Sequence, residues 1–489
     1  MGGERRRKPQ ALDMTYEPPR SDMGGSAPRA RRSALALAAV IVLGAGATAR
    51  AEDTVPRVSP DRIEDVPSTK PDPFPAFDNF AWRAFVALNW PASRDAGHRG
   101  EPDRAKGLGD SGPRVWETFK ARYELFARGP GGGPIAPTPW ASTGGPNPCG
   151  ASADARVKTL AAFDPFADFN QASFSPGRPM NVLVAQNRTY VRYEVRVNRT
   201  EYDSIVAHGW EFGRSLPTAE APGGVDVGAV AVKAAWRLLT AQDTPEIRKR
   251  SYVVEGAEVT DVAKSLAAHR TVCAKQDIAL VGLHIAVKTK YRPQWIWSTF
   301  EHVDNVPPVG VGDAREPDAI VAGAPYSFND PAKGQKDVAP PADSPPAWPV
   351  DAGNPPRVDP EPMQVIRKHA INAQTMAMNR AYWALPEIRG TVWANYMLVA
   401  TQWPTVTQPP SPDNDGRYFP GVRIESGTPA EPYQTGADGG DPDQNLVNTT
   451  METYAQDSPS SCMACHNAVS NVRGRDFVAI LPEGPVKAR

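Results

Sequence analysis

The chain has 489 residues, and its 54 Lys and Arg nearly balance its 55 Asp and Glu, for a formal net charge of −1. This balance does not predict nucleic acid binding, which usually comes with a basic patch. The length allows two or three packed layers, and beyond residue 51 no apolar run is long enough to span a bilayer.

The first 51 residues have the pattern of an export signal. Arginines at 29–32 precede an apolar run, 34–46, which ends in the A-x-A sequence at 49–51. This order predicts a secretory signal peptide over residues 1–51 and therefore a periplasmic or otherwise exported protein. The run falls short of the roughly 20 residues of a spanning helix, but residues 34–49 are marginal in length, so the alternative is an uncleaved N-terminal anchor. We expect membrane contact only in that case.

The next region predicts aromatic helices that contribute to a core. Residues 52–75 are rich in Pro and Asp and predict an extended surface segment. Apolar side chains then recur with helical spacing over 77–88, and Pro91 ends the pattern. A second short helix is predicted where Trp116, Phe119, Tyr123 and Phe126 share one face. Residues 129–150 form a Gly- and Pro-rich loop.

The middle of the chain changes to a period of two, which predicts strands. The runs at 191–197 and 230–236 alternate apolar and polar residues and predict half-buried strands, separated by a short capped helix at 200–209. Two more strands are predicted at 277–288, which leads into the aromatic run 295–302, and at 392–401. Helices do not alternate regularly with these strands, so we expect mostly antiparallel pairing.

The last third alternates irregular stretches with helical signals. A Pro-rich stretch, 303–362, leads to a predicted helix over 363–384, and a polar stretch, 404–444, follows. Thr449-x-x-Glu452 has the form of a capping box and predicts a further helix. Together these patterns predict an α+β domain over 52–444 with Pro-rich loop insertions, followed by a distinct segment over 445–489.

The four cysteines divide into two pairs. Cys149 and Cys273 are far apart in the sequence, and disulfides persist in an exported protein. We therefore expect a disulfide between them, and the alternative is two unrelated buried thiols.

The other two cysteines belong to the motif C-x-x-C-H, formed by Cys462, Cys465 and His466. Two thiols at this spacing can add to the vinyl groups on one edge of a porphyrin, and the adjacent imidazole then ligates the iron. A zinc site would lack a fourth ligand and would have to use the neighbouring Cys465 and His466 together. A redox-active dithiol would need a thioredoxin-like βαβ setting, which the strand pattern does not predict.

With its export signal and its C-x-x-C-H motif, the chain resembles the c-type cytochrome superfamily. Outside the motif it is similar to large single-haem proteins of proteobacteria known as cytochrome c family proteins. The resemblance implies one haem c bound covalently through Cys462 and Cys465, with His466 as the proximal iron ligand.

The second axial ligand is expected upstream of the motif, or the iron has an open site. The 23 residues after His466 include neither Met nor His. His302 is one candidate, because aromatic residues precede it and Asp304 and Asn305 could orient it; the alternative is a surface residue at the end of a strand. His284 is the other candidate, and its alternative is a hydrogen-bonded core histidine.

These features leave two functions open. Electron transfer to and from a redox partner protein suits one haem near a terminus, whereas a haem-dependent peroxidase or oxygenase would use the large domain to build a pocket for a small oxidant or substrate. The sequence decides neither whether the protein is an enzyme nor which substrate it uses. Residues 445–489 are too few to bury a haem on both faces, so we expect this haem c segment to pack on the β core.

Overall fold

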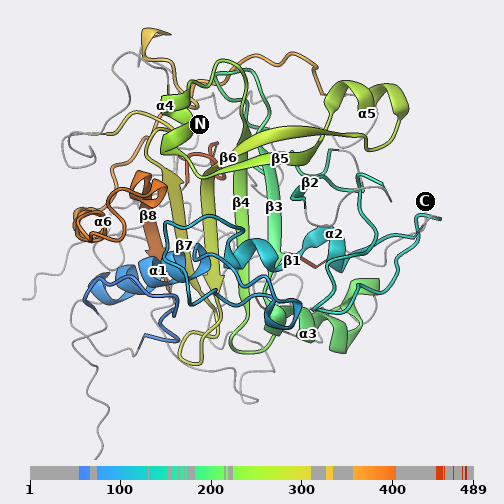
Figure 1. The fold of residues 1–489 in the computed structure, drawn as a ribbon, viewed down its shortest axis with the longest axis horizontal. Coiled ribbons are helices and arrows are strands. Elements are labelled where there is room, and N and C mark those ends of the chain that lie inside the picture. The colour runs from blue at the N-terminus through green and yellow to red at the C-terminus, as the bar shows by residue number, and fades with distance from the viewer. Residues whose placement is uncertain are drawn as a thin grey trace, which may run out of the picture. The chain divides into compact units, whose positions relative to one another are not determined.

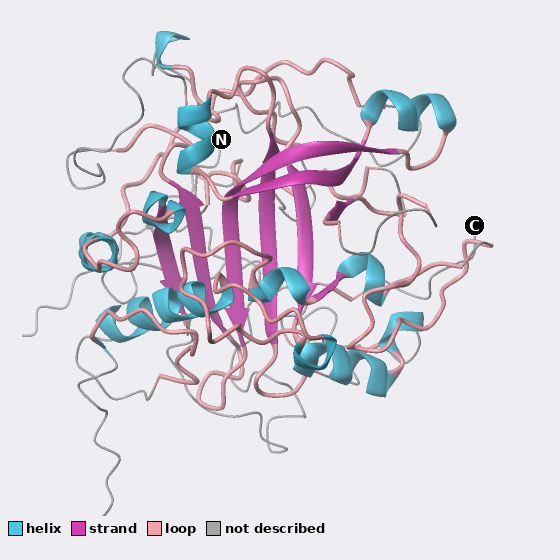
Figure 2. Cartoon of the chain, in the orientation of Figure 1, coloured by secondary structure: helices cyan, strands magenta, loops and turns pink. Residues whose placement is uncertain are grey.

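The computed structural model describes a central eight-stranded sheet with helices around it (Figures 1 and 2). The described residues are 54–66, 74–129, 131–150, 157–163, 166–169, 171–172, 182–213, 216–218, 224–309, 326–333, 356–403, 448–454, 456, 466, 476, 480 and 481. The predicted leader, residues 1–51, lies outside them, as does most of the Pro-rich stretch 303–362. No helix among the described residues is long and apolar enough to cross a membrane.

The strands are β1 Lys120–Ala121, β2 Thr159–Leu160, β3 Arg192–Val197, β4 Val230–Leu238, β5 Val253–Thr260, β6 Cys273–Val287, β7 Ile296–His302 and β8 Tyr396–Gln402. The α-helices are α1 Phe74–Leu88, α2 Arg122–Leu125, α3 Arg199–His208, α4 Pro245–Arg250, α5 Val262–Ala268 and α6 Ala373–Trp383. Short 3-10 helices are η2 Ala96–His98, η3 Val115–Thr118, η4 Trp210–Phe212, η5 Pro331–Lys333 and η6 Val392–Asn395.

The sheet has the strand order β1-β3-β4-β6-β5-β2, and β7 joins β6 to β8. Every pair is antiparallel except β2 with β5, which confirms the predicted α+β class with mostly antiparallel strands. The 15-residue strand β6 makes this arrangement possible, because its first half pairs with β5 and its second half with β7. In Figures 1 and 2 the long β5–β6 hairpin bends across the top of the sheet.

One face of the sheet is covered by α1 and α6, and we call it the helix-covered face. Trp82 and Phe85 of α1 pack against Phe300 of β7, with ring centroids 5.2 and 4.3 Å apart. Trp82 also stacks on Tyr382 of α6 at 4.7 Å. This aromatic cluster contributes most of the large buried side chains, so it is the main core.

The opposite face carries the described residues of the C-terminal segment, and we call it the segment face. Met451 packs against Ala235 of β4 and Val281 of β6, and Ile480 and Leu481 belong to a cluster around Trp297. Because side chains alternate along a strand, the odd-numbered residues of β7 point to this face and the even-numbered ones to the helix-covered face.

Two predicted helices are confirmed. The pattern at 77–88 lies within α1, and the helix predicted at 200–209 is α3. The Asn198 side chain caps the start of α3 by accepting from the Glu201 amide, and Gly209 ends it in the left-handed region, with φ of 67°.

Three helix predictions were wrong in part or in full. The predicted helix at 116–126 breaks into η3, β1 and α2, since Lys120 and Ala121 pair with β3. The predicted helix at 363–384 begins only at Ala373, where Asn372 caps it. Residues 448–454 form turns, with the Glu452 carboxylate accepting from the Asn448 amide.

The strand predictions identified the sheet but not its burial. All but one of the residues of β3 are buried, so the description of this strand as half-buried was wrong. Its charged residues are neutralised internally: Glu194 binds Arg196 at 2.6 Å and Lys158 at 2.7 Å. The run at 392–401 becomes a strand only from Tyr396, and β5 was not predicted.

Candidate functional site

The haem motif is represented by His466, because Cys462 and Cys465 lie outside the described residues. The His466 imidazole is partly exposed, and its ring centroid lies 4.3 Å from that of Trp297. Trp297, the second residue of β7, points to the segment face and pairs with Ala286 of β6. The predicted proximal ligand therefore sits on this face, beside a buried indole.

Next to Trp297 the segment face contains a partly exposed group of residues in otherwise buried strands. Val195, Lys233 and His284 form one row across β3, β4 and β6, and Ala231 belongs to the neighbouring row. Each of them is partly exposed, whereas their neighbours in these parts of the strands are buried. We call them the open patch.

The open patch has the character expected of a wall for a porphyrin. In the row that contains Trp297, the sheet presents only methyl groups, at the partly exposed Ala231 and the buried Ala286. The indole of Trp297 lies at one end of this pair, and His284 lies in the next row. These side chains are of the kinds that could line a haem held by His466.

His284 is paired with an acidic residue of the C-terminal segment. Its Nε2 lies 3.3 Å from the Glu452 carboxylate. Burial alone would raise the pKa of Glu452, but His284, Lys233 and the Asn448 amide together lower it, so the carboxylate is ionised and orients the imidazole. His284 therefore lies on the predicted face, within the open patch, as a candidate second ligand or acid–base group.

His302 is positioned differently, and we do not retain it as an iron ligand. It is an even-numbered residue of β7 and faces the helix-covered side, edge-on to Tyr396 with ring centroids 5.0 Å apart. Its Nε2 is 3.0 Å from the Arg250 carbonyl oxygen, and its Nδ1 accepts from the Asp304 amide at 3.1 Å. Burial lowers its pKa, so the ring is a neutral core histidine with both nitrogens bonded.

The turn at 448–450 anchors the C-terminal segment on β6 and β7. Asn448 Nδ2 donates to Thr299 Oγ1 at 3.0 Å and to the Phe300 carbonyl at 2.8 Å. Thr449 donates to Glu301 through both its amide and its hydroxyl, at 3.0 and 2.6 Å. Glu301 is fully buried and forms an ion pair with Arg367. Thr299 is the cross-strand partner of His284, so this anchor lies beside His284.

A second anchor follows the haem motif by ten residues. Asp476 is fully buried and forms an ion pair with Lys288, just beyond the end of β6. Its backbone carbonyl also accepts from Trp295 Nε1 at 3.2 Å. Trp295 has φ of 71°, an unusual conformation for a bulky residue, and it is held there by a turn in which its amide donates to the Arg292 carbonyl.

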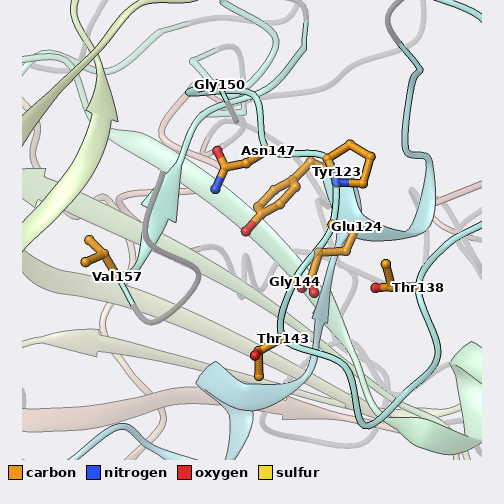
Figure 3. A pocket seen from close by; sticks show the side chains of 10 residues that line it. Tyr123, Glu124, Thr138, Thr143, Gly144, Asn147, Gly150 and Val157 are labelled. Carbon is orange, nitrogen blue, oxygen red and sulfur yellow. The ribbon is translucent and has the colours of Figure 1, made fainter. Parts of the chain in front are cut away.

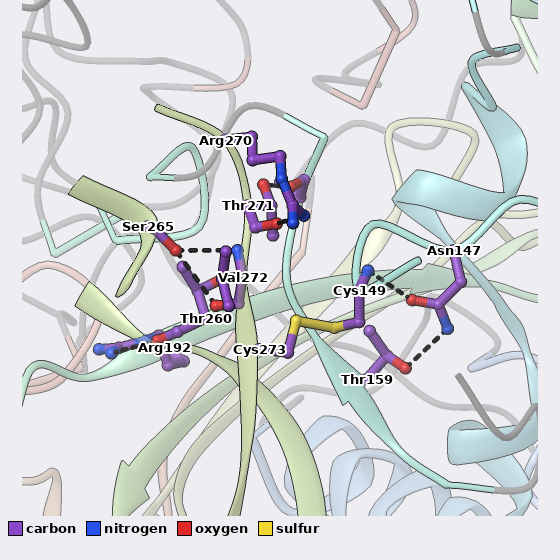
Figure 4. The surroundings of a disulfide bond; sticks show 11 residues. Asn147, Cys149, Thr159, Arg192, Thr260, Ser265, Arg270, Thr271, Val272 and Cys273 are labelled. Atoms are coloured by element: carbon purple, nitrogen blue, oxygen red, sulfur yellow. Dashed lines mark hydrogen bonds between the residues drawn. A yellow bond between two sulfur atoms is a disulfide. The ribbon is translucent and has the colours of Figure 1, made fainter. Parts of the chain in front are cut away.

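Cys149 and Cys273 are joined in a disulfide, the pairing expected from the sequence (Figure 4). The bond ties the 141–150 loop to the start of β6. Asn147 supports the same junction, since its Oδ1 accepts from the Cys149 amide at 2.8 Å and its Nδ2 donates to Thr159 Oγ1 at 3.1 Å.

A small polar pocket of about 50 Å³ lies in the same loop region (Figure 3). Tyr123, Glu124, Thr138 and Asn147 contribute to its lining. Glu124 is bound by Arg99 at 3.3 Å and Lys120 at 3.4 Å. Burial lowers the pKa of Lys120 to about 8. The pocket is lined by none of the residues around His466.

Several residues of the site were not predicted as such. Glu452 was noted only as part of a capping box, and Lys233 and Ala231 only as members of an alternating run. The alternation could have placed them on a face, but the register between strands is needed to bring them beside Trp297. A comparison with protein-family models, curated proteins and solved structures finds no match for this chain.

Proposed function

We propose that the protein is an exported haem c protein that transfers electrons through one haem. Cys462 and Cys465 would hold the haem covalently, and His466 would be its proximal ligand. The observation that carries the proposal is the C-x-x-C-H motif, together with the packing of its histidine on Trp297 beside the open patch. The partner is a redox protein, and the site of action is the periplasm or the outside of the cell.

A bound haem would supply a one-electron iron couple, and the chain's own residues would decide how it is used. Trp297 packs against the His466 ring and restricts its rotation. Ala231 and Ala286 present methyl groups beside it, while two anchors hold the C-terminal segment before and after the motif. Such a preformed setting favours electron transfer, which needs little structural change.

His284 is our candidate for the second axial ligand. It shares the segment face with His466, and its Nε2 lies 3.3 Å from the Glu452 carboxylate. A carboxylate behind a ligating histidine fixes the orientation of the ring and increases its basicity.

The His284–Glu452 pair also supports a second candidate function, a haem-dependent peroxidase or oxygenase. In that role His284 would leave the iron open and would move a proton to or from a small oxidant, with Glu452 holding its charged form. The protein would then be an enzyme, with a small molecule as its substrate.

Optical and paramagnetic spectra of the purified ferric protein separate the two functions. We expect a low-spin spectrum, converted to high-spin by His284→Ala and unchanged by His302→Ala, the matched control on the other face. A high-spin parent that reacts with peroxide, and loses this reaction in His284→Ala, would support the enzyme instead.

The covalent attachment has its own test. The double variant Cys462→Ala/Cys465→Ala should lose all haem staining after denaturing electrophoresis, whereas Cys149→Ala/Cys273→Ala should keep it. Haem that stays on the Cys462/Cys465 variant would overturn the proposed attachment.

A further inference from the structure

A buried carboxyl without a hydrogen-bond partner lies where the C-terminal segment meets the β core. Glu201, in the first turn of α3, is fully buried, and neither of its carboxyl oxygens has a hydrogen-bond partner among the described residues. Oδ1 of Asp476, from the segment, is likewise without one. A buried carboxylate in this condition is very unfavourable, so a cation or a proton is needed.

Asp476 reaches this position by close insertion into the core. Its backbone carbonyl is held by the Trp295 indole, and its carboxylate pairs with Lys288. Gly224 lies directly against it, since a Cβ at position 224 would overlap the Asp476 carboxylate. The Asp476 side chain is therefore closely packed between Gly224 and Lys288 and shielded from water.

The charges in this cluster do not balance. Asp476 and Lys288 are the charged groups that act on Glu201, and they act in opposite directions. The other charged residues nearby are engaged elsewhere: Asp226 binds the Ser204 hydroxyl at 2.9 Å, and Arg199 pairs with Asp203 on the exposed side of α3. Within the part of the chain that the structure describes, two carboxyls thus share one ammonium group, which leaves one negative charge to be neutralised.

A proton meets this requirement. Burial, reinforced by Asp476, raises the pKa of Glu201 to about 8. Burial also raises the pKa of Asp476 to about 6, although Lys288 opposes the change. At neutral pH Glu201 is therefore protonated and Asp476 is ionised and paired with Lys288.

We infer that Glu201, Asp476 and Lys288 form a proton-binding site at this interface, so that docking of the C-terminal segment takes up a proton and weakens as the pH rises. When the segment is released, water hydrates the carboxyls and their affinity for protons falls. The inference goes beyond the proposed function, because no haem group takes part in the site.

The sign and size of the effect follow from linkage. A carboxyl whose pKa is raised by docking stabilises the docked state fully below its ordinary pKa, and this contribution is lost as the pH rises through the docked value. Between pH 6 and 8 the docked state binds one more proton than the released state, and this proton is on Glu201. The docking equilibrium should therefore weaken by about tenfold per pH unit, and no further above pH 8.

Hydrogen exchange of the full chain tests the inference. Peptides that cover residues 476–481 are followed from pH 6 to 9, with labelling times scaled to the intrinsic exchange rate. The population of the open segment should rise by about tenfold per pH unit up to pH 8 in the parent. Glu201→Gln should show no such slope, whereas the control Glu211→Gln, another buried acid of the same region, should keep it.

Two results would overturn the inference: a parent without a slope, or a Glu201→Gln variant with the parent's slope. If Glu201→Gln does not fold, Asp476→Asn tests the same point, because removal of the second carboxyl should also reduce the slope. The measurement can be repeated on the Cys462→Ala/Cys465→Ala variant. The same slope there would confirm that the site is independent of haem, so its failure and that of the proposed function are distinguishable.

Discussion

Replacing Gly282 by alanine should shift the 448–451 turn on the sheet and weaken its docking. Gly282 lies in β6 directly below this turn: a Cβ there would overlap Thr450 Oγ1 and lie 3.1 Å from Met451 Cε and 3.3 Å from Asn448 Oδ1. Position 282 therefore needs glycine for close approach and not for an unusual backbone conformation.

The size of the effect comes from two competing terms. Overpacking a well-ordered site costs about 1–3 kcal/mol, and alanine regains about 0.5–1 kcal/mol over glycine in a strand. Complete detachment would break four hydrogen bonds from Asn448 and Thr449 to β7, at about 1 kcal/mol each. Since the strain is smaller than this loss, the turn should shift but stay docked, and the free energy of unfolding should fall by about 1–2 kcal/mol.

Urea unfolding measures the loss of stability, and hydrogen exchange measures the loosening of the turn. We expect the urea midpoint of Gly282→Ala to fall by about 0.3–0.7 M for a slope near 3 kcal/mol per M. Protection of peptides over 448–454 should fall by about tenfold or more. Thr450→Ala in the Gly282→Ala background deletes the overlapped hydroxyl and should restore part of the loss. Gly133→Ala is the control, because a Cβ there meets nothing within 4 Å. An unchanged midpoint with unchanged protection at 448–454 would refute the reasoning.

Two further changes test other features of the fold. Cys149→Ser/Cys273→Ser opens a disulfide between residues 124 apart, and the free energy of unfolding should fall by about 4–5 kcal/mol in urea; a loss below 1 kcal/mol would show that the bond contributes little. Arg367→Met leaves the buried Glu301 carboxylate without its counter-ion and should cost about 3–5 kcal/mol. The double variant Glu301→Gln/Arg367→Met should recover most of that loss, and equal losses in the single and double variants would argue against a coupled pair.

The alternating patterns were sufficient to predict the sheet, because a period of two is a local property of the sequence. They could not show that both faces are covered. Arg192, Glu194 and Arg196 look solvent-facing, yet all three are buried. The segment 115–121 and Lys158 bind Arg196 and Glu194, and the carbonyls of Tyr190 and Thr260 accept from Arg192. Burial of the polar face depends on segments far away in the sequence.

Dependence on distant segments also explains why the helix predicted at 363–384 begins only at Ala373. Its first ten residues mix good helix formers, such as Gln364 and Arg367, with weaker ones such as Val365. Arg367 forms an ion pair with Glu301, and Gln364 exchanges hydrogen bonds with Asp330. These contacts join positions more than thirty residues apart and hold the chain extended. Weak local propensity gives way to them.

For the candidate site, the motif could be read locally because its five residues are contiguous. The choice between His284 and His302 could not be made from the local sequence. Each lies in a strand with the right alternation, and only the pairing of β6 with β7 shows that His284 faces the segment and His302 the helices. Their relation to His466 depends on a register set by long-range pairing.

The contacts of the 448–450 turn have a consequence for the order of folding. Asn448 bonds to Thr299 and Phe300, which are 149 and 148 positions earlier in the chain. Closing so long a loop is slow compared with forming local hairpins such as β5–β6. We therefore expect the segment face to be completed last, after the sheet has formed. Until that step the 448–450 turn is not docked on β7, so the haem attachment that we propose would precede its docking.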